Sequence, residues 1–443
     1  MQKKQIMKAL WLAGTWIACA ATTMAQTPAD TTDRIADSIN IQDHLYATGQ
    51  LPGRLAVRKE GIATFPWVKA SVICHARNRQ GGLYECRATV TPGGDYLLMF
   101  PDGGHYGKAG VKINDMLAYR SQDRGRTWKG PVVAFDIDYN QHGFIPFIPR
   151  NSSRIYAFGT QPIWGLYSRQ NGLQENAPIG YRYSDDDGYH WSAVHLIRPV
   201  NDTGFEGMSV MRMTETNRGT WLLGSHESDW SYKPLMTRQY ILRSTDQGRT
   251  WTLLPGKRHG GWYARCFNRM DEGRPIHLGG DSVLFMVRTP EGHLWSSYST
   301  DDGKTWNEPK PTPLVHPDAP PMLFRLSDGK TLIAFFHNRF HDRDYNGLSG
   351  KKDIMMDRSE LWFSLSADDG RTWSEPRFFL VNALAPAYAS DFRNYQCSYM
   401  DVFADHGELH CFIPHRWERI LYVHVRESDL DKFPTRAELL QQK

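Results

Sequence analysis

Cysteine is scarce in this sequence and never occurs as a close pair. The chain has 6 Cys among 443 residues, and no two of them are spaced as Cys-x-x-Cys. Structural zinc sites usually draw their ligands from such pairs, so the sequence argues against one. Cys74 and Cys86 could lie on adjacent strands and form a disulfide in an oxidising compartment. Two buried thiols are the equal alternative.

Long apolar runs are also absent, with one short exception at the N-terminus. Three lysines precede an apolar run from Ala9 to Ala21, and small residues then lead to Ala25. A membrane-spanning helix needs roughly 20 apolar residues, more than this run provides. The layout therefore predicts a signal peptide over residues 1–25, cleaved near Ala25. Cys19 offers a weaker alternative, a lipoprotein signal. We expect a secreted or periplasmic protein without membrane insertion.

An excess of one charge is missing as well. The chain has 52 Lys and Arg against 48 Asp and Glu, and three of the lysines belong to the leader. The remainder is close to neutral and lacks the basic surface that binding to phosphate backbones requires. We expect no nucleic-acid partner.

What the sequence does contain is one eight-residue pattern, Ser-x-Asp-x-Gly-x-Thr-Trp, repeated five times. The copies begin at Ser121, Ser184, Ser244, Ser299 and Ser366, and the second has His190 in place of Thr. Each copy follows a run of strand-forming residues, and its Asp and Gly favour a tight turn. We expect each copy to join the third and fourth strands of a propeller blade on the outer rim, in a structural role. Asp185–Gly188 also fits part of a Ca²⁺ loop, but the other EF-hand ligands are missing.

The spacing of the repeats predicts an all-β protein, a six-bladed β-propeller with five Asp boxes. Successive copies lie 63, 60, 55 and 67 residues apart, and a period near 60 with several short strands is typical of radially repeated sheets. The expected organisation is a polar lead-in over 26–55, the propeller over 56–430 and a C-terminal tail or short helix over 431–443. A seventh blade near the N-terminus is the alternative.

This arrangement resembles the sialidase (neuraminidase) superfamily, whose Asp-box or BNR repeats decorate a six-bladed propeller. The resemblance implies three arginines that bind a substrate carboxylate, an Asp acid/base, and a Tyr nucleophile assisted by a Glu. Matching segments point to Arg87 in LYECRATV, Arg288 in VLFMVR and Arg358 in RSELWFSL. Arg87 is followed by Ala-Thr where the family has Ile-Pro. Asp102 in FPDGGHYG lies where the acid/base is expected.

The nucleophile segment departs from the family pattern, which is Tyr-Ser followed by an apolar strand. Here the segment reads NYQCSYMDVF. Cys397 precedes Ser398, and Tyr395 and Tyr399 flank the pair. The resemblance therefore assigns no nucleophile.

Histidines in the segments between the boxes suggest a second kind of chemistry. His105 follows Asp102, His142 lies in a loop with Gly and Pro, and HGGWYARCF supplies His259 with Tyr263 and Arg265; GSHESDW supplies His226. Such residues suit a lyase: Arg neutralises a uronate carboxylate, while His or Tyr removes the C5 proton and protonates the leaving oxygen. In size, leader and composition the chain resembles secreted rhamnosyl-glucuronate lyases and rhamnosidases on related propellers.

These observations predict an exo-acting, sialidase-like enzyme that removes a terminal acidic sugar from glycans. A uronate-specific lyase or rhamnosidase and a non-catalytic glycan-binding propeller are the alternatives. We expect a monomer with no cofactor and no catalytic metal, a structural Ca²⁺ being the one exception considered. The candidate catalytic residues are Asp102, His105, His142 and Tyr263, and the candidate carboxylate-binding residues are Arg87, Arg265, Arg288 and Arg358.

Three arginines around a Tyr–Glu pair would favour the first function. A His–Tyr–Arg cluster would favour the second, and an aromatic channel poor in charge the third.

Overall fold

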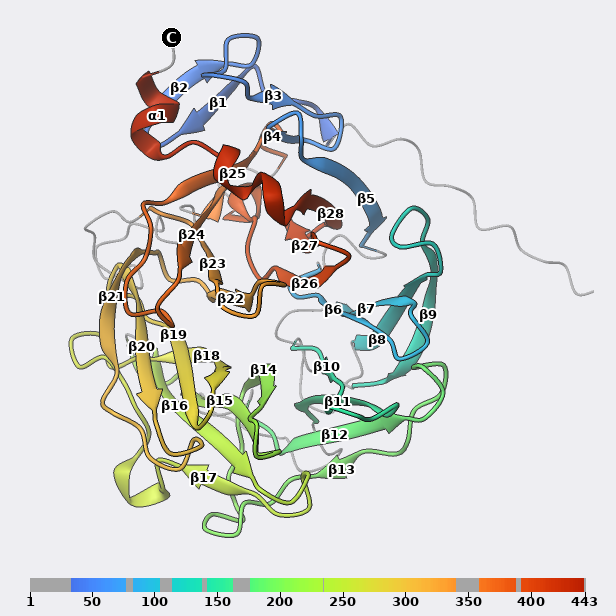
Figure 1. Cartoon of the computed structure of the whole chain (residues 1–443), viewed down its shortest axis with the longest axis vertical. Coiled ribbons are helices and arrows are strands. Elements are labelled where there is room, and N and C mark those ends of the chain that lie inside the picture. Colours follow the sequence, from blue (N-terminus) through green and yellow to red (C-terminus); the bar gives the residue numbers. More distant parts are fainter. Residues whose placement is uncertain are drawn as a thin grey trace, which may run out of the picture.

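Six antiparallel sheets surround a central axis in the computed structural model, each forming one blade of a propeller (Figure 1). The structure describes residues 33–76, 83–103, 114–137, 142–161, 176–233, 235–339, 358–387 and 392–441. The prediction of an all-β, six-bladed propeller is confirmed. The alternative of a seventh blade is wrong, because near the N-terminus the described residues form only a two-stranded sheet of β1 (Ser38–Ile41) and β2 (His44–Ala47). The predicted signal peptide lies outside the described residues.

The first five blades each contain four strands that are consecutive in sequence. The first blade comprises β6 (Arg87–Val90), β7 (Tyr96–Gly103), β8 (Asn114–Ser121) and β9 (Lys129–Asp136). The second comprises β10 (Ile145–Phe147), β11 (Ile155–Thr160), β12 (Ile179–Ser184) and β13 (His195–Leu196). The third comprises β14 (Ser209–Glu215), β15 (Trp221–Asp229), β16 (Met236–Ser244) and β17 (Thr252–Leu254). Blades four and five comprise β18 (Asp271–Gly279), β19 (Ser282–Arg288), β20 (His293–Ser299) and β21 (Lys310–Val315); and β22 (Met322–Arg325), β23 (Leu332–Phe336), β24 (Glu360–Ser366) and β25 (Arg377–Asn382).

The sixth blade joins the two ends of the chain. Its first three strands are β26 (Asp401–Asp405), β27 (Glu408–His415) and β28 (Arg419–Arg426), and the fourth is β5 (Lys69–His75) from the N-terminal part. The short strands β3 (Ala56–Val57) and β4 (Ile62–Thr64) extend the fifth blade at its outer edge. The ring is therefore closed by hydrogen bonds between its first and last segments.

Blades pack face to face, so their middle strands are buried on both sides. All five residues of β23 are buried, which explains its unbroken apolar sequence LIAFF. The hydrophobic core is divided into clusters that bridge neighbouring blades; in one, Phe158 of the second blade packs with Trp221 of the third.

The five boxes join the third and fourth strands of blades one to five, as predicted. In the first box, Ser121 Oγ accepts the Gly125 N–H at 2.7 Å. The Asp123 carboxylate accepts the Thr127 N–H at 2.8 Å and the Thr127 hydroxyl at 2.6 Å. Gly125 has a φ of +79°, and a Cβ there would lie 2.3 Å from Tyr422 Oη of the sixth blade. The box is thus a closed turn whose glycine packs on the neighbouring blade.

Short helical segments complete the described chain. They are η2 (Lys257–His259), η5 (Phe392–Tyr395), η6 (Glu427–Lys432) and α1 (Arg436–Gln441). Among the described residues, no helix has the length and apolar character needed to cross a membrane. No disulfide joins Cys74 and Cys86 in this part of the chain, and both side chains are buried.

Candidate functional site

One end of the propeller axis gathers a cluster of buried charged side chains. The first strands of the blades, β6, β10, β14, β18, β22 and β26, line the axis and contact their neighbours around the ring (Figure 1). Because strands alternate in direction within a blade, the starts of these inner strands share one face and the boxes lie on the other. The charged residues occupy the starts of inner strands and the turns between second and third strands. We call this group the axial cluster: Glu85, Arg87, His142, Glu272, Arg274, Arg288, Asp318, Arg358 and Tyr399.

A tyrosine–glutamate pair lies within the axial cluster. The Tyr399 hydroxyl, just before β26, donates to Glu272 Oε1 at 2.7 Å, and Glu272 lies at the start of β18. Arg288, at the end of β19, donates to the other Glu272 oxygen and to Tyr399 Oη at 3.2 Å. All three side chains are buried or nearly so. The sequence pattern had left the nucleophile position without a tyrosine, and the structure brings Tyr399 into contact with a carboxylate.

Electrostatics fix the protonation of this pair. Burial would raise the pKa of Glu272, but above all the charge and the hydrogen bond of Arg288 counteract it and hold that pKa below its ordinary value. Burial and the negative charge of Glu272 raise the pKa of Tyr399 well above its ordinary value. At neutral pH Glu272 is thus a carboxylate and Tyr399 a phenol. Tyr399 can act as a nucleophile only if its proton passes to Glu272 as it attacks.

Both members of the pair have an unusual backbone. Tyr399 has a φ of +60° and Glu272 a φ of +51°, in the left-handed region that side chains with a Cβ rarely adopt. Each such residue costs on the order of 1 kcal/mol, and the same conformation recurs in the box turns, as at Arg124 and Asp187. The conformation turns both side chains toward the axis and each other.

Three of the four predicted carboxylate-binding arginines belong to the axial cluster. Arg288 donates to Asp318 at 2.6 Å as well as to Glu272. The Arg358 guanidinium lies 5.9 Å from the centre of the Tyr399 ring and donates to Gln396 at 3.3 Å and to the Asp318 carbonyl. Arg87 pairs with Glu85 at 2.8 Å.

Positive charge in the axial cluster is only partly balanced. Burial, together with the positive charge of the nearby Arg288, lowers the pKa of Arg358 to about 10. Burial, with the charge of Arg87, lowers the pKa of Arg274 to about 9. Arg288 differs, because Asp318, Glu272 and Asp271 outweigh the effect of burial and raise its pKa. Arg358 and Arg274 are therefore the cations that an incoming anion would stabilise most.

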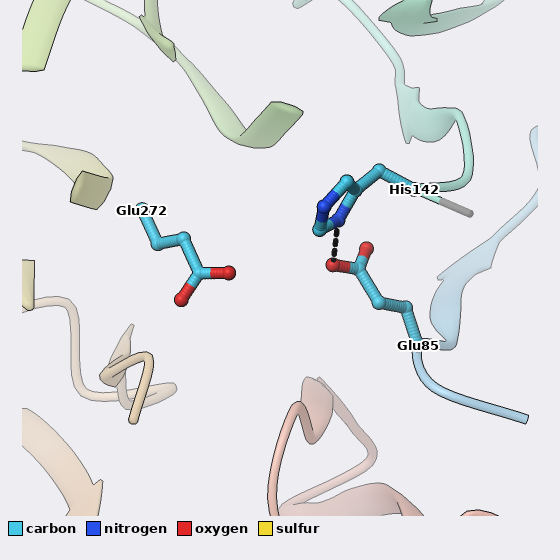
Figure 2. Close-up of side chains that lie close together, drawn as sticks. All are labelled: Glu85, His142 and Glu272. Atoms are coloured by element: carbon cyan, nitrogen blue, oxygen red, sulfur yellow. Dashed lines mark hydrogen bonds and ion pairs between the residues drawn. The ribbon is translucent and has the colours of Figure 1, made fainter. Parts of the chain in front are cut away.

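A histidine–glutamate pair faces Glu272. His142 lies just before β10, and its Nδ1 is 2.6 Å from Glu85 Oε1. Figure 2 shows Glu85 and His142 side by side with the Glu272 carboxylate turned toward them. Ligand atoms of the three residues all lie within 4.8 Å of one another, a geometry that a metal ion could use. Arg87 and Arg288 already supply positive charge to the two carboxylates, so the grouping has an explanation without an ion.

His226 serves the same region in a different way. It is buried on β15, and burial lowers its pKa to about 4, so the ring is neutral at pH 7. Its Nδ1 lies 3.4 Å from the backbone N–H of Glu272 and accepts from it. His226 thus helps to hold Glu272 in its strained conformation.

The other predicted site residues lie elsewhere or outside the described part. Asp102 is at the end of β7, but its side chain is not among those described, and His105 lies outside the described residues. Tyr263 is 42 % exposed and packs under Arg238, in the connection between β17 and β18. Arg265, in the same connection, is exposed.

Several residues of the axial cluster were not found from the sequence. Glu85, Glu272, Arg274 and Asp318 carry no motif, because each gains its role from the ring geometry that brings six strand ends together. Tyr399 did carry a usable signal. It lies two residues before β26, and Met400 occupies the place where the family pattern has Ser.

Comparisons with known proteins agree with this fold. Residues 150–411 match the family described as the BNR repeat-like domain. A sialidase from Micromonospora viridifaciens is 23% identical over 343 residues, which covers 67% of this chain and 46% of that protein. A xyloglucanase from Paenibacillus sp is 25% identical over 228 residues, 51% of this chain and 20% of that protein.

Among solved structures, the Hadza microbial sialidase Hz136 superposes with a TM-score of 0.60 at 16% identity and covers 82% of this chain and 69% of that one. This chain spans less than half the length of the two relatives matched by sequence. At these identities the likeness concerns the propeller fold.

Proposed function

We propose that this chain, which belongs to the family of BNR repeat-like domains, is a glycosidase that removes a terminal acidic sugar from glycans. The observation that carries the proposal is the Tyr399–Glu272 pair beside Arg288 and Arg358. It supplies a nucleophile, a base for that nucleophile, and cations for a carboxylate in one place. Sialidase is the activity named for one relative and for several structural neighbours.

The arginines would set the substrate class. Arg guanidinium groups offer planar, permanently charged donors that match a carboxylate. Arg358 and Arg274 gain most from an anion, since burial lowers the pKa of each. A sugar carboxylate placed between Arg358 and Arg288 would hold the anomeric carbon near Tyr399.

Tyr399 and Glu272 would then carry the covalent step. Tyr399 Oη attacks the anomeric carbon, Glu272 takes the phenol proton, and the bond to the leaving sugar breaks. Arg288, which contacts both residues, keeps Glu272 ionised until that moment. Water later releases the sugar from Tyr399, and the proton returns from Glu272 to the tyrosine. We further propose that residues 1–25 direct the protein out of the cytoplasm.

The test uses purified protein without its leader, incubated with a sialyl-oligosaccharide and with a rhamnosyl-glucuronate glycan. The expected product is the free acidic sugar from the first substrate, measured by mass spectrometry. Tyr399→Phe should reduce kcat/KM by at least about 10³-fold, since the nucleophile is lost. Tyr395→Phe is the matched control, because Tyr395 lies four residues away at the end of η5 and should leave activity unchanged.

A uronate lyase is the second candidate, favoured by the presence of His142, Tyr399 and the arginines in one axial cluster. Its signature is a 4,5-unsaturated uronate, which absorbs ultraviolet light. That product, with no release of free acidic sugar, would refute the glycosidase. The high density of buried charge along the axis argues against a purely binding propeller.

A further inference from the structure

We propose that His142, oriented by Glu85, is the proton donor to the leaving group and the base that later activates water. This assignment rests on the proposed glycosidase function. It places the acid/base role just before β10 of the second blade, whereas the sequence resemblance points to Asp102 on β7 of the first blade.

Geometry orients the His142 ring. Burial would raise the pKa of Glu85, but the charges of Arg87 and His142 outweigh it, so Glu85 is a carboxylate and can only accept hydrogen bonds. The 2.6 Å contact therefore places a proton on His142 Nδ1. A histidine held through Nδ1 by a carboxylate presents Nε2 for proton exchange, because the partner fixes both the tautomer and the ring plane. Glu85 is in turn fixed by Arg87 at 2.8 Å.

The position of His142 fits the second half of an acid/base system. Glu272 is committed to Tyr399 and Arg288 through its two oxygens. Ligand atoms of His142 and Glu272 lie within 4.8 Å of each other. Figure 2 shows the Glu272 carboxylate turned toward His142 and Glu85. A glycosidase with a tyrosine nucleophile needs, besides the base for that tyrosine, a second group that exchanges a proton with the leaving oxygen.

The proton balance closes with these residues alone. In the proposed cycle His142 starts as an imidazolium, with the carboxylates of Glu85 and Glu272 nearby. As Tyr399 Oη bonds to the anomeric carbon and Glu272 takes its proton, the glycosidic bond breaks and Nε2 gives its proton to the leaving oxygen. Water then attacks the anomeric carbon, and Nε2 takes the proton of water. The bond to Tyr399 breaks, and Glu272 returns the proton to Oη.

Leaving-group dependence tests the role directly. The 4-nitrophenolate leaving group departs without being protonated, whereas the oxygen of a leaving sugar must receive a proton as the bond breaks. For His142→Gln we expect kcat/KM to fall about 10²- to 10⁴-fold on a sialyl-lactose and less than about 10-fold on the 4-nitrophenyl sialoside. The constant kcat/KM is used because it reports the first bond-breaking step. Azide, which needs no base, should restore turnover of the nitrophenyl substrate by His142→Gln.

Three further variants make the result decisive. Glu85→Gln should also lose more kcat/KM on the sialyl-lactose than on the 4-nitrophenyl sialoside, but the loss should be smaller than for His142→Gln. One limb of its pH–rate profile should shift, because Glu85 acts by positioning His142. His259→Gln, at an exposed histidine paired with Glu308, should behave as wild type. Equal losses on both substrates for His142→Gln, or a leaving-group effect confined to Asp102→Asn, would overturn the assignment.

Failure of the underlying function has a separate signature. A wild-type protein that cleaves neither substrate refutes the glycosidase proposal and, with it, the role of His142. If the wild-type protein is active and His142→Gln is fully active on both substrates, only the role of His142 is refuted and the glycosidase proposal stands.

Discussion

Replacing Arg358 and Arg288 in turn by Met should separate a binding arginine from a structural one. Burial lowers the pKa of Arg358 to about 10. Since one pKa unit corresponds to about 1.4 kcal/mol, keeping this guanidinium charged in the empty site costs on the order of 3 kcal/mol. Arg358→Met removes that cost but loses two charged hydrogen bonds, to Gln396 and to the Asp318 carbonyl, worth about 1.5–3 kcal/mol each. The free energy of unfolding should therefore fall by no more than about 3 kcal/mol.

Arg288→Met should behave differently, although the two arginines share one cluster. Its removal leaves Glu272, Asp318 and Asp271 buried with much less positive charge beside them. Breaking a buried ion pair in this way typically costs about 3–5 kcal/mol. Both variants should lose about 10- to 10²-fold in kcat/KM on an acidic-sugar glycoside, because a charged hydrogen bond to the carboxylate is worth about 1.5–3 kcal/mol.

Urea unfolding without ligand, together with steady-state kinetics, checks the pair of predictions. The reasoning is refuted if Arg358→Met is destabilised as much as Arg288→Met. It is also refuted if Arg358→Met keeps full activity, since Arg358 would then be a blade residue without a ligand.

Three other outcomes can be measured with standard assays. Free sialic acid at 100 times its Kd should stabilise the wild type by about 2.7 kcal/mol in thermal unfolding and Arg358→Met far less, whereas equal stabilisation of both proteins would argue against a carboxylate at Arg358. The pKa of Glu272 in the folded protein is below its ordinary value, so the ionised carboxylate stabilises the fold above about pH 4.5 and stops doing so as the pH falls through the folded-state pKa. The difference in unfolding free energy between wild type and Glu272→Gln should therefore become smaller in acid, and a difference independent of pH would contradict this. Gly125→Ala combines a φ of +79° with a Cβ that would clash with Tyr422 Oη, and urea unfolding should show a loss of about 2–3 kcal/mol. Gly94→Ala, where φ is +90° but nothing lies within 4 Å, should lose only the backbone strain of about 1 kcal/mol, and equal losses would contradict the contact between the blades.

The scaffold could be predicted from sequence because its signals are local. Each box encodes its own turn: the Asp accepts bonds from residues four positions on, and the Gly takes the left-handed conformation. Five copies at a regular spacing then imply the ring. The sixth blade could be inferred only by subtraction, since no box precedes its last strand and that strand, β5, comes from the other end of the chain.

The axial cluster could be predicted only in part, because proximity around the axis has no sequence pattern. Arg87, Arg288 and Arg358 were found because each lies beside a strand with a recognisable sequence. Glu272 and Glu85 have no such marker, although they give Tyr399 and His142 their chemistry. Tyr263 was a candidate because His259 and Arg265 lie close to it in the sequence, but the structure places it under Arg238 at an exposed position.

The pairing of β28 with β5 also determines when the axial cluster can form. The pairing of Arg419 with His75 across these strands closes a very long loop, and the entropy cost of closure grows with loop length. During synthesis β5 emerges early and must wait, as an unpaired edge, until nearly the whole chain has been made. Tyr399, Glu272 and His142 come from three different blades, so they reach their final distances only when the ring shuts. Acquisition of activity should therefore be the last event in folding, later than the burial of any single blade.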